Sequence, residues 1–172
     1  PTEWLLLGAN VRSITTYREK PIKKTKYTLM QADLEAAIII DKWRLVATAG
    51  RQAFPKEGEF VSRRHYILYQ LTHNDYLRAG RFQFNYGIKS ANHTISVKEA
   101  LDFSIAYKGE TYNLEYAHIG EKYNLYLTSI LAPASEFERY ADKDETAFSL
   151  KTTYVFKESY KLGLSTFYSK SK

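Results

Sequence analysis

The chain contains no cysteine, so it can form no disulfide framework, thiolate metal site or thiol nucleophile. Proline is scarce, and its four copies fall in stretches that we predict to be loops or the terminus. Because proline removes a backbone hydrogen-bond donor, this placement is expected if most of the chain is strand. No segment approaches the ~20 consecutive apolar residues of a transmembrane helix. The first residues also lack the basic and apolar regions of an export signal, which predicts that any such signal has been removed or was never present.

Motifs of several catalytic and binding classes are also missing. The chain has no nucleophile elbow, P-loop or dinucleotide-binding glycine motif. Its four histidines do not follow the spacing of a zinc site. The strands carry no RNP-like signature for single-stranded nucleic acid. We therefore predict no enzymatic activity, no metal, no cofactor and no nucleic-acid partner.

The net charge and the aromatic content indicate what kind of surface the protein presents. The 25 basic residues exceed the 19 acidic ones, which gives a net charge of +6, and this permits attraction to anions while being typical of an ordinary solvated surface. Aromatic residues make up 15% of the chain, and most of them are tyrosine, whose apolar ring and polar tip suit strands and half-wet boundaries. We expect residues 1–172 to form a single domain.

Polar and apolar residues alternate along several segments. Between Met30 and Ala36 one parity is wholly apolar, whereas the other carries Gln31, Asp33 and Glu35. Successive side chains of a strand point to opposite faces, so this pattern predicts a sheet with one apolar and one polar face. The predicted strands are 3–18, 27–40, 43–53, 60–72, 76–87, 101–118, 122–131, 146–156 and 160–170. The only helical candidate is a single turn at 96–101.

The predicted connections alternate in length along the chain. The short ones are 41–42, 73–75, 119–121 and 157–159, and the long ones are 19–26, 54–59, 88–100 and 132–145. One edge of the sheet would thus carry tight turns and the other larger loops, as in transmembrane barrels of bacterial outer membranes. This alternation depends on a bulge at 108–110, where the apolar parity switches; a turn there would give ten strands.

The lengths and ends of the strands favour lipid as the solvent of the apolar face. A membrane-spanning strand needs ~9–11 residues, and aromatic side chains mark its two ends. The candidates for such an aromatic girdle are Trp43, Tyr76, Tyr123, Phe156 and Tyr160. A soluble lipocalin-like barrel shares the alternation, but it turns the apolar face inward.

The polar face would line the interior of the barrel. The candidates for this lining are Arg12, Gln31, Asp33, Glu35, Arg44, Arg78, Asn113, Glu115, Asn124, Lys151 and Lys161. Guanidinium groups in a lumen favour anions. Alternatively, the basic side chains pair with acidic ones and merely fill the interior. The basic candidates for such pairs are Arg12, Arg44, Arg51, Arg63 or Arg64, Arg78, Arg81, Lys151 and Lys161, and the acidic ones are Asp33, Glu35, Asp102 and Glu115.

Residues 77–88 read Leu-Arg-Ala-Gly-Arg-Phe-Gln-Phe-Asn-Tyr-Gly-Ile. This segment resembles a strand of Gram-negative outer-membrane porins of the phosphate-selective and alginate-export type, in which a basic-small-Gly-basic-Phe stretch runs up to an aromatic-Gly before an outer loop. The resemblance implies an outer-membrane barrel with a water-filled lumen, and it carries over no solute preference. Arg78 and Arg81 have opposite parity, which predicts a bulge near Gly80.

Together these patterns predict an all-β, antiparallel up-and-down transmembrane β-barrel of about nine or ten strands in a bacterial outer membrane. Natural single-chain barrels have even strand numbers and usually end in an aromatic residue, so the odd count and the polar end 168–172 predict a segment of a larger barrel. The predicted role is porin-like passage of small hydrophilic solutes, anions among them. The bilayer, lipopolysaccharide and a protein partner or further copy are the predicted contacts. The alternatives are a non-conducting structural or interaction barrel and a soluble ligand-binding barrel.

Overall fold

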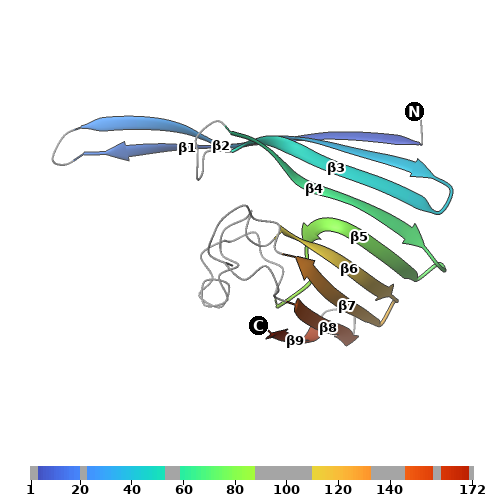
Figure 1. Cartoon of the computed structure of the whole chain (residues 1–172). Coiled ribbons are helices and arrows are strands. Elements are labelled where there is room, and N and C mark those ends of the chain that lie inside the picture. The colour runs from blue at the N-terminus through green and yellow to red at the C-terminus, as the bar shows by residue number, and fades with distance from the viewer. Residues whose placement is uncertain are drawn as a thin grey trace.

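The computed structural model describes residues 4–19, 23–52, 59–87, 110–132, 146–156 and 160–170. They form one nine-stranded antiparallel sheet in which each strand pairs with its neighbours in the sequence (Figure 1). The strands are β1 Leu5–Arg18, β2 Lys24–Ile40, β3 Trp43–Gln52, β4 Glu59–Gln70, β5 Asp75–Gln83, β6 Glu110–Ile119, β7 Tyr123–Ala132, β8 Thr146–Phe156 and β9 Tyr160–Lys170. The predicted all-β up-and-down order is confirmed. Within these residues, no helix is long and apolar enough to cross a membrane.

The predicted closed barrel is not observed. In the described part of the chain β1 and β9 are the two edges of the sheet, and they do not pair with each other. The sheet curls from β1–β4 round to β9 and leaves one side open (Figure 1). All odd-numbered strands run in the same direction, because every neighbouring pair is antiparallel. Direct closure of β9 on β1 would therefore need a parallel pair, whereas antiparallel closure needs an odd number of further strands between them.

The connections between the described strands alternate in length, long and short, from β1 to β9. The predicted alternation also depended on residues 101–109, which fall outside the described residues. The connections of two to four residues at 41–42, 71–74, 120–122 and 157–159 join strand ends at one edge of the sheet, here called the turn edge. The longer connections 19–23, 53–58, 84–109 and 133–145 lie at the other end, here called the loop edge. The tightest turn contains Asp41 with a φ of 49°, a left-handed conformation that aspartate tolerates.

The region around β5 differs most from the prediction. β5 ends at Gln83 rather than at 87, and its register with β4 and β6 is uninterrupted, so the bulge predicted near Gly80 is wrong. Gly80 instead has a φ of 131°, and a Cβ added there would lie 2.4 Å from the carbonyl oxygen of His65. Arg78 and Arg81 therefore lie on opposite faces. The predicted helical turn 96–101, the strand portion 101–109 and most of the bulge 108–110 fall outside the described residues.

The two faces of the sheet differ in chemistry and in exposure. On the face here called apolar, every strand presents a large exposed hydrophobic side chain: Leu7, Leu34, Leu45, Ile67, Leu77, Leu114, Leu127, Leu150 and Leu164. The opposite face, here called polar, holds buried polar side chains: Asp33, Thr48, Arg63, Asn113, Glu115, Thr128 and Ser149. Leu34 is 71% exposed, whereas its neighbour Asp33 is only 3% exposed. Burial on this sheet is therefore greater for the polar side chains than for their apolar neighbours.

Candidate functional site

The register places all of the predicted interior residues on the polar face. Arg12 faces Gln31 across β1 and β2, and Arg78 faces Glu115 across β5 and β6. Lys151 of β8 faces Ser165 of β9. The remaining members follow from the same strand pairings and are Asp33, Glu35, Arg44, Asn113, Asn124 and Lys161. The two-residue period of the sequence is thus enough to group them on one face.

Glu115 is the centre of this face. Its side chain is 2% exposed, and its Oε1 accepts a hydrogen bond of 2.6 Å from Nη2 of Arg78. Its Oε2 accepts from the Thr128 hydroxyl at 2.9 Å and from Nδ2 of Asn85 at 3.0 Å. The Arg78 guanidinium also lies 3.8 Å from the ring centre of Phe82. A buried carboxylate is stable only with such partners, so Glu115 holds three strands and the segment after β5 together.

A second buried ion pair joins β2 to β4. Nε of Arg63 lies 2.9 Å from Oδ1 of Asp33, and the two side chains are 7% and 2% exposed. Gln31 donates a further hydrogen bond to Asp33. Arg63 sits at the register shift opposite Thr48 and Ala49. Gly50 provides the space, because a Cβ there would lie 2.3 Å from the Asp33 carboxylate.

The segment 84–87, here called the inward segment, leaves β5 and crosses the polar face. Phe84 packs on Ile130 and Ala147 and stacks on Phe167, with ring centres 5.7 Å apart. Tyr86 meets the same phenylalanine edge-on, with ring centres 5.9 Å apart. This small cluster is the apolar core of the described structure, and it lies between the inward segment and the wall formed by β7, β8 and β9.

Hydrogen bonds fix the inward segment to the same wall. The Ser149 hydroxyl donates to the carbonyl of Asn85 at 3.0 Å, and Nζ of Lys151 donates to the carbonyl of Gly87 at 2.7 Å. The amide of Gly87 donates to the Ser165 hydroxyl at 3.0 Å. The backbone of the inward segment therefore finds partners in β8 and β9, although it follows β5 directly. Sequence reasoning missed this segment and instead assigned it to the strand.

The charges that remain on the polar face are mainly cationic. Arg44 donates to Oε1 of Gln70 at 3.3 and 3.4 Å, and Lys151 is held by a carbonyl. Arg12, Lys161 and Glu35 are exposed to solvent. Asp33 and Glu115 are paired with arginines, and Glu35 is a further acidic side chain on this face. Arg63 and Arg78 are thus the arginines of this face that form the ion pairs described above.

Aromatic residues of the apolar face form a row at the turn edge. Trp43, Tyr123, Phe156 and Tyr160 are all exposed there, and Trp43 packs on Tyr69 with ring centres 4.4 Å apart. The remaining girdle candidate, Tyr76, lies on the polar face, and its hydroxyl donates to the carbonyl of His73 at 3.0 Å. A second exposed row follows the loop edge and was not foreseen: Phe60, Tyr112, Phe148 and Tyr168.

Asp75 anchors the turn between β4 and β5, two residues before Leu77, where the apolar face begins. It accepts hydrogen bonds from Thr72, from the Tyr116 hydroxyl at 2.7 Å and from Nδ1 of His118 at 2.8 Å. These donors, Thr72 first, lower the pKa of Asp75 from 3.8 to about 2. Because the bonds join the start of β5 to the end of β6, the cluster has a structural role.

Acid is expected to destabilise the sheet through Asp75. A carboxylate whose pKa is depressed by folding contributes stability above its unfolded pKa, and loses it as the pH falls through the folded value of about 2. The folded fraction in detergent should therefore fall between about pH 5 and pH 2. An Asp75→Asn variant should lose part of this dependence. Equal acid sensitivity of the two proteins, followed by circular dichroism, would contradict the assignment.

Two comparisons with known proteins found nothing similar. No protein-family model matches the chain, and no curated protein matches it. Among the described residues, no group of three or more histidine, aspartate or glutamate side chains is arranged to hold a metal ion. The arrangement of the two faces and the inward segment is therefore the basis for a functional proposal.

Proposed function

We propose that this chain forms part of the wall of an outer-membrane β-barrel that lets small hydrophilic solutes pass. In this proposal the apolar face contacts lipid, and the polar face lines a water-filled passage. The observation that carries it is the reversal of burial across the sheet, seen most sharply at Leu34 and Asp33. An exposed apolar surface that continues over nine strands is far larger than soluble proteins tolerate.

The two aromatic rows support the same placement. Tyrosine and tryptophan favour the boundary between water and hydrocarbon, and barrels carry such residues at both ends of an apolar band ~25 Å tall. In β8, Tyr154 lies near the turn edge, Phe148 near the loop edge and Leu150 between them. In β9, Tyr160 and Tyr168 enclose Leu162 and Leu164 in the same way.

The open edges bear on how such a wall is completed. Each unpaired backbone group in hydrocarbon costs several kcal/mol, so only closed barrels are stable there. We propose that an odd number of further strands joins β9 to β1, since this number keeps every pair antiparallel. The described sheet would then be one part of a larger barrel, in which the polar face encloses the lumen.

The inward segment would narrow this lumen from β5 to β9. Its hydrogen bonds to Ser149, Lys151 and Ser165 fix it against the wall, so it restricts the passage without moving freely. The same segment is the observation that favours the second candidate, a non-conducting barrel. Conductance separates the two, because a plugged barrel gives no single-channel steps in a planar bilayer.

Dependence on detergent tests the membrane placement. We expect the purified protein to aggregate without detergent and to insert into lipid vesicles, where protease should spare the strands. A protein that stays monodisperse in plain buffer would contradict the proposal and favour the soluble alternative. This measurement is independent of whether the barrel conducts.

Ion preference tests the lining of the passage. Arg44 lies on the polar face and has the neutral partner Gln70, so an Arg44→Glu variant reverses a lumen charge without breaking an ion pair. We expect its reversal potential in a salt gradient to shift toward cations, because fixed charges set local ion concentrations. Lys42→Glu, in an exposed tight turn, serves as the control and should shift it little. An unchanged reversal potential for Arg44→Glu would show that Arg44 does not face the lumen.

A further inference from the structure

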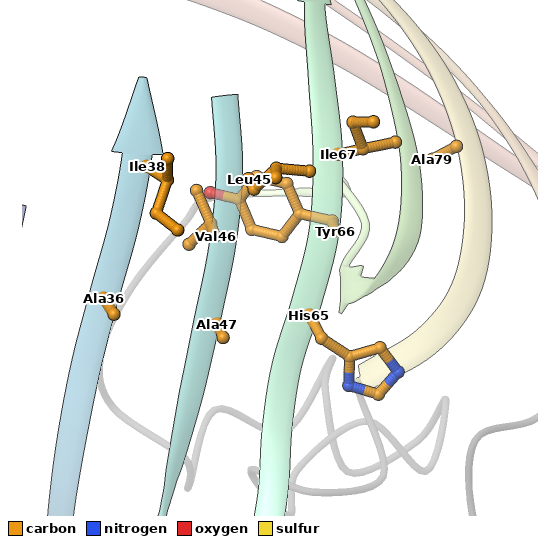
Figure 2. Close-up of a pocket in the computed structure, with 9 residues that line it drawn as sticks. All are labelled: Ala36, Ile38, Leu45, Val46, Ala47, His65, Tyr66, Ile67 and Ala79. Atoms are coloured by element: carbon orange, nitrogen blue, oxygen red, sulfur yellow. The ribbon is translucent and has the colours of Figure 1, made fainter. Parts of the chain in front are cut away.

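A shallow groove of about 390 Å³ lies on the sheet across β2–β5 (Figure 2). Most of its lining belongs to the apolar face, where the small side chains of Ala36, Ala47 and Ala79 leave space between larger ones. Ile38, Leu45 and Ile67 line the part nearer the turn edge. His65 closes the end nearer the loop edge, beside Ala47 (Figure 2). The groove is therefore apolar along its length and polar at one end.

A cluster of polar side chains adjoins this end of the groove, on the face opposite the proposed lumen. Arg81 lies between His65 of β4 and Tyr112 of β6 in the register, on the apolar face. Nε2 of His65 is 3.3 Å from the Tyr112 hydroxyl, and its Nδ1 is 2.9 Å from the Ser62 hydroxyl. Nε of Arg81 is buried and has no hydrogen-bond partner in the described structure. A buried guanidinium nitrogen without a hydrogen-bond partner is costly on a lipid-facing surface, so this one favours a bound anion.

We propose that the groove and this cluster bind one phosphate-bearing lipid, with an acyl chain along the alanines and the phosphate at Arg81. This inference rests on the proposed membrane placement and adds a specific ligand site to it. A phosphate offers several charged acceptors, and the cluster supplies a guanidinium, two hydroxyl groups and an imidazole. Charge complementarity therefore selects an anion at this end.

The direction of the groove selects a lipid rather than a free anion or a second copy of the chain. The polar cluster includes Tyr112 near the loop edge, and the apolar groove runs from His65 toward the turn edge, the direction in which an acyl chain runs from its headgroup into the bilayer. Small side chains at Ala36 and Ala47 admit a chain of methylene groups without any rearrangement.

Native mass spectrometry of the detergent-solubilised protein tests the site, with phosphatidic acid as the probe and diacylglycerol as the same lipid without phosphate. We expect retention of phosphatidic acid but not of diacylglycerol. Arg81→Gln should weaken retention about tenfold, as expected for the loss of one charge-assisted contact. Ala47→Leu fills the groove without changing the charge and should weaken it as well. Lys42→Gln, which removes a charge from a distant turn, should leave retention unchanged.

Other outcomes overturn the inference. Equal retention of phosphatidic acid by Arg81→Gln and by the unchanged protein would show that Arg81 does not bind the phosphate. Displacement of the lipid by inorganic phosphate alone would indicate an anion site without an acyl chain. A dimer that Ala47→Leu dissociates would indicate a second copy in the groove. If the protein inserts into vesicles but fails these tests, only the lipid site is wrong; if it needs no detergent, the membrane placement fails first.

Discussion

Truncation of Glu115 to alanine is expected to lower the unfolding free energy by about 4 kcal/mol and to raise the conductance of the assembled barrel. The loss of stability arises because Arg78 keeps its charge on a largely buried face without its 2.6 Å partner. Thr128 and Asn85 lose their acceptor at the same time. Since Asn85 belongs to the inward segment, that segment should loosen from the wall and widen the passage. Denaturant unfolding and single-channel recordings measure the two effects.

Asp33→Ala is the matched control. Asp33 is an equally buried carboxylate with an arginine partner, but its contacts are to Arg63 and Gln31 and not to the inward segment. It should lose comparable stability without the rise in conductance that release of the inward segment gives. Removing Arg78 together with Glu115 should cost less than the sum of the two single changes, because no buried charge is then left alone. An equal change of conductance in the Asp33 and Glu115 variants would show that the inward segment does not restrict the passage.

The faces of this sheet could be predicted because they follow from backbone geometry alone. A strand alternates its side chains whatever it packs against, so parity grouped the residues from Arg12 to Lys161 correctly on one face. The same reasoning could not say whether the sheet closes. Closure depends on the curvature of the sheet and on the pairing of its edge strands. Neither can be predicted from the alternation of polar and apolar residues within single strands.

The inward segment could not be predicted, because its sequence continues the pattern of β5. Phe82, Phe84 and Tyr86 share one parity and read as a strand that runs to 87. Partners distant in the sequence take the chain out of the sheet: Ser149 lies 64 residues from Asn85, and Ser165 lies 78 from Gly87. Only tertiary contacts of this kind decide the end of the strand.

Pairing of the buried charges was likewise only partly predictable. Glu115 and Arg78 stood among the expected partners, and the uninterrupted register of β5 and β6 sets them directly opposite each other. Arg63 or Arg64 also stood among the basic side chains expected on this face, without a choice between the two. Arg63 and Arg64 are adjacent in the sequence, and only the register shift opposite Thr48 and Ala49 determines that Arg63 reaches the carboxylate.

A lysine in the middle of the apolar face gives the largest effect that distinguishes lipid from water. Leu127 and Tyr123 lie on the same strand and the same face, and they are 46% and 51% exposed. In water the two positions are equivalent, and a lysine at either would change stability by about 0.5 kcal/mol or less. In a bilayer Leu127 lies near the middle of the apolar band and Tyr123 at its boundary. Leu127→Lys should then cost about 2–4 kcal/mol, and Tyr123→Lys about 1 kcal/mol or less.

Denaturant unfolding from vesicles, followed by the fluorescence of the two tryptophans, measures both variants against the unchanged protein. Exposure cannot explain a difference between them, because Leu127 is the less exposed of the two by only a small margin. Loss of packing cannot explain it either, because the substitution of Tyr123 removes a larger side chain than the substitution of Leu127. A cost that rises with distance from the turn edge therefore measures depth in hydrocarbon. Equal and small costs at Leu127 and Tyr123 would mean that water covers the apolar face, and the passage proposed along the polar face would fall with it.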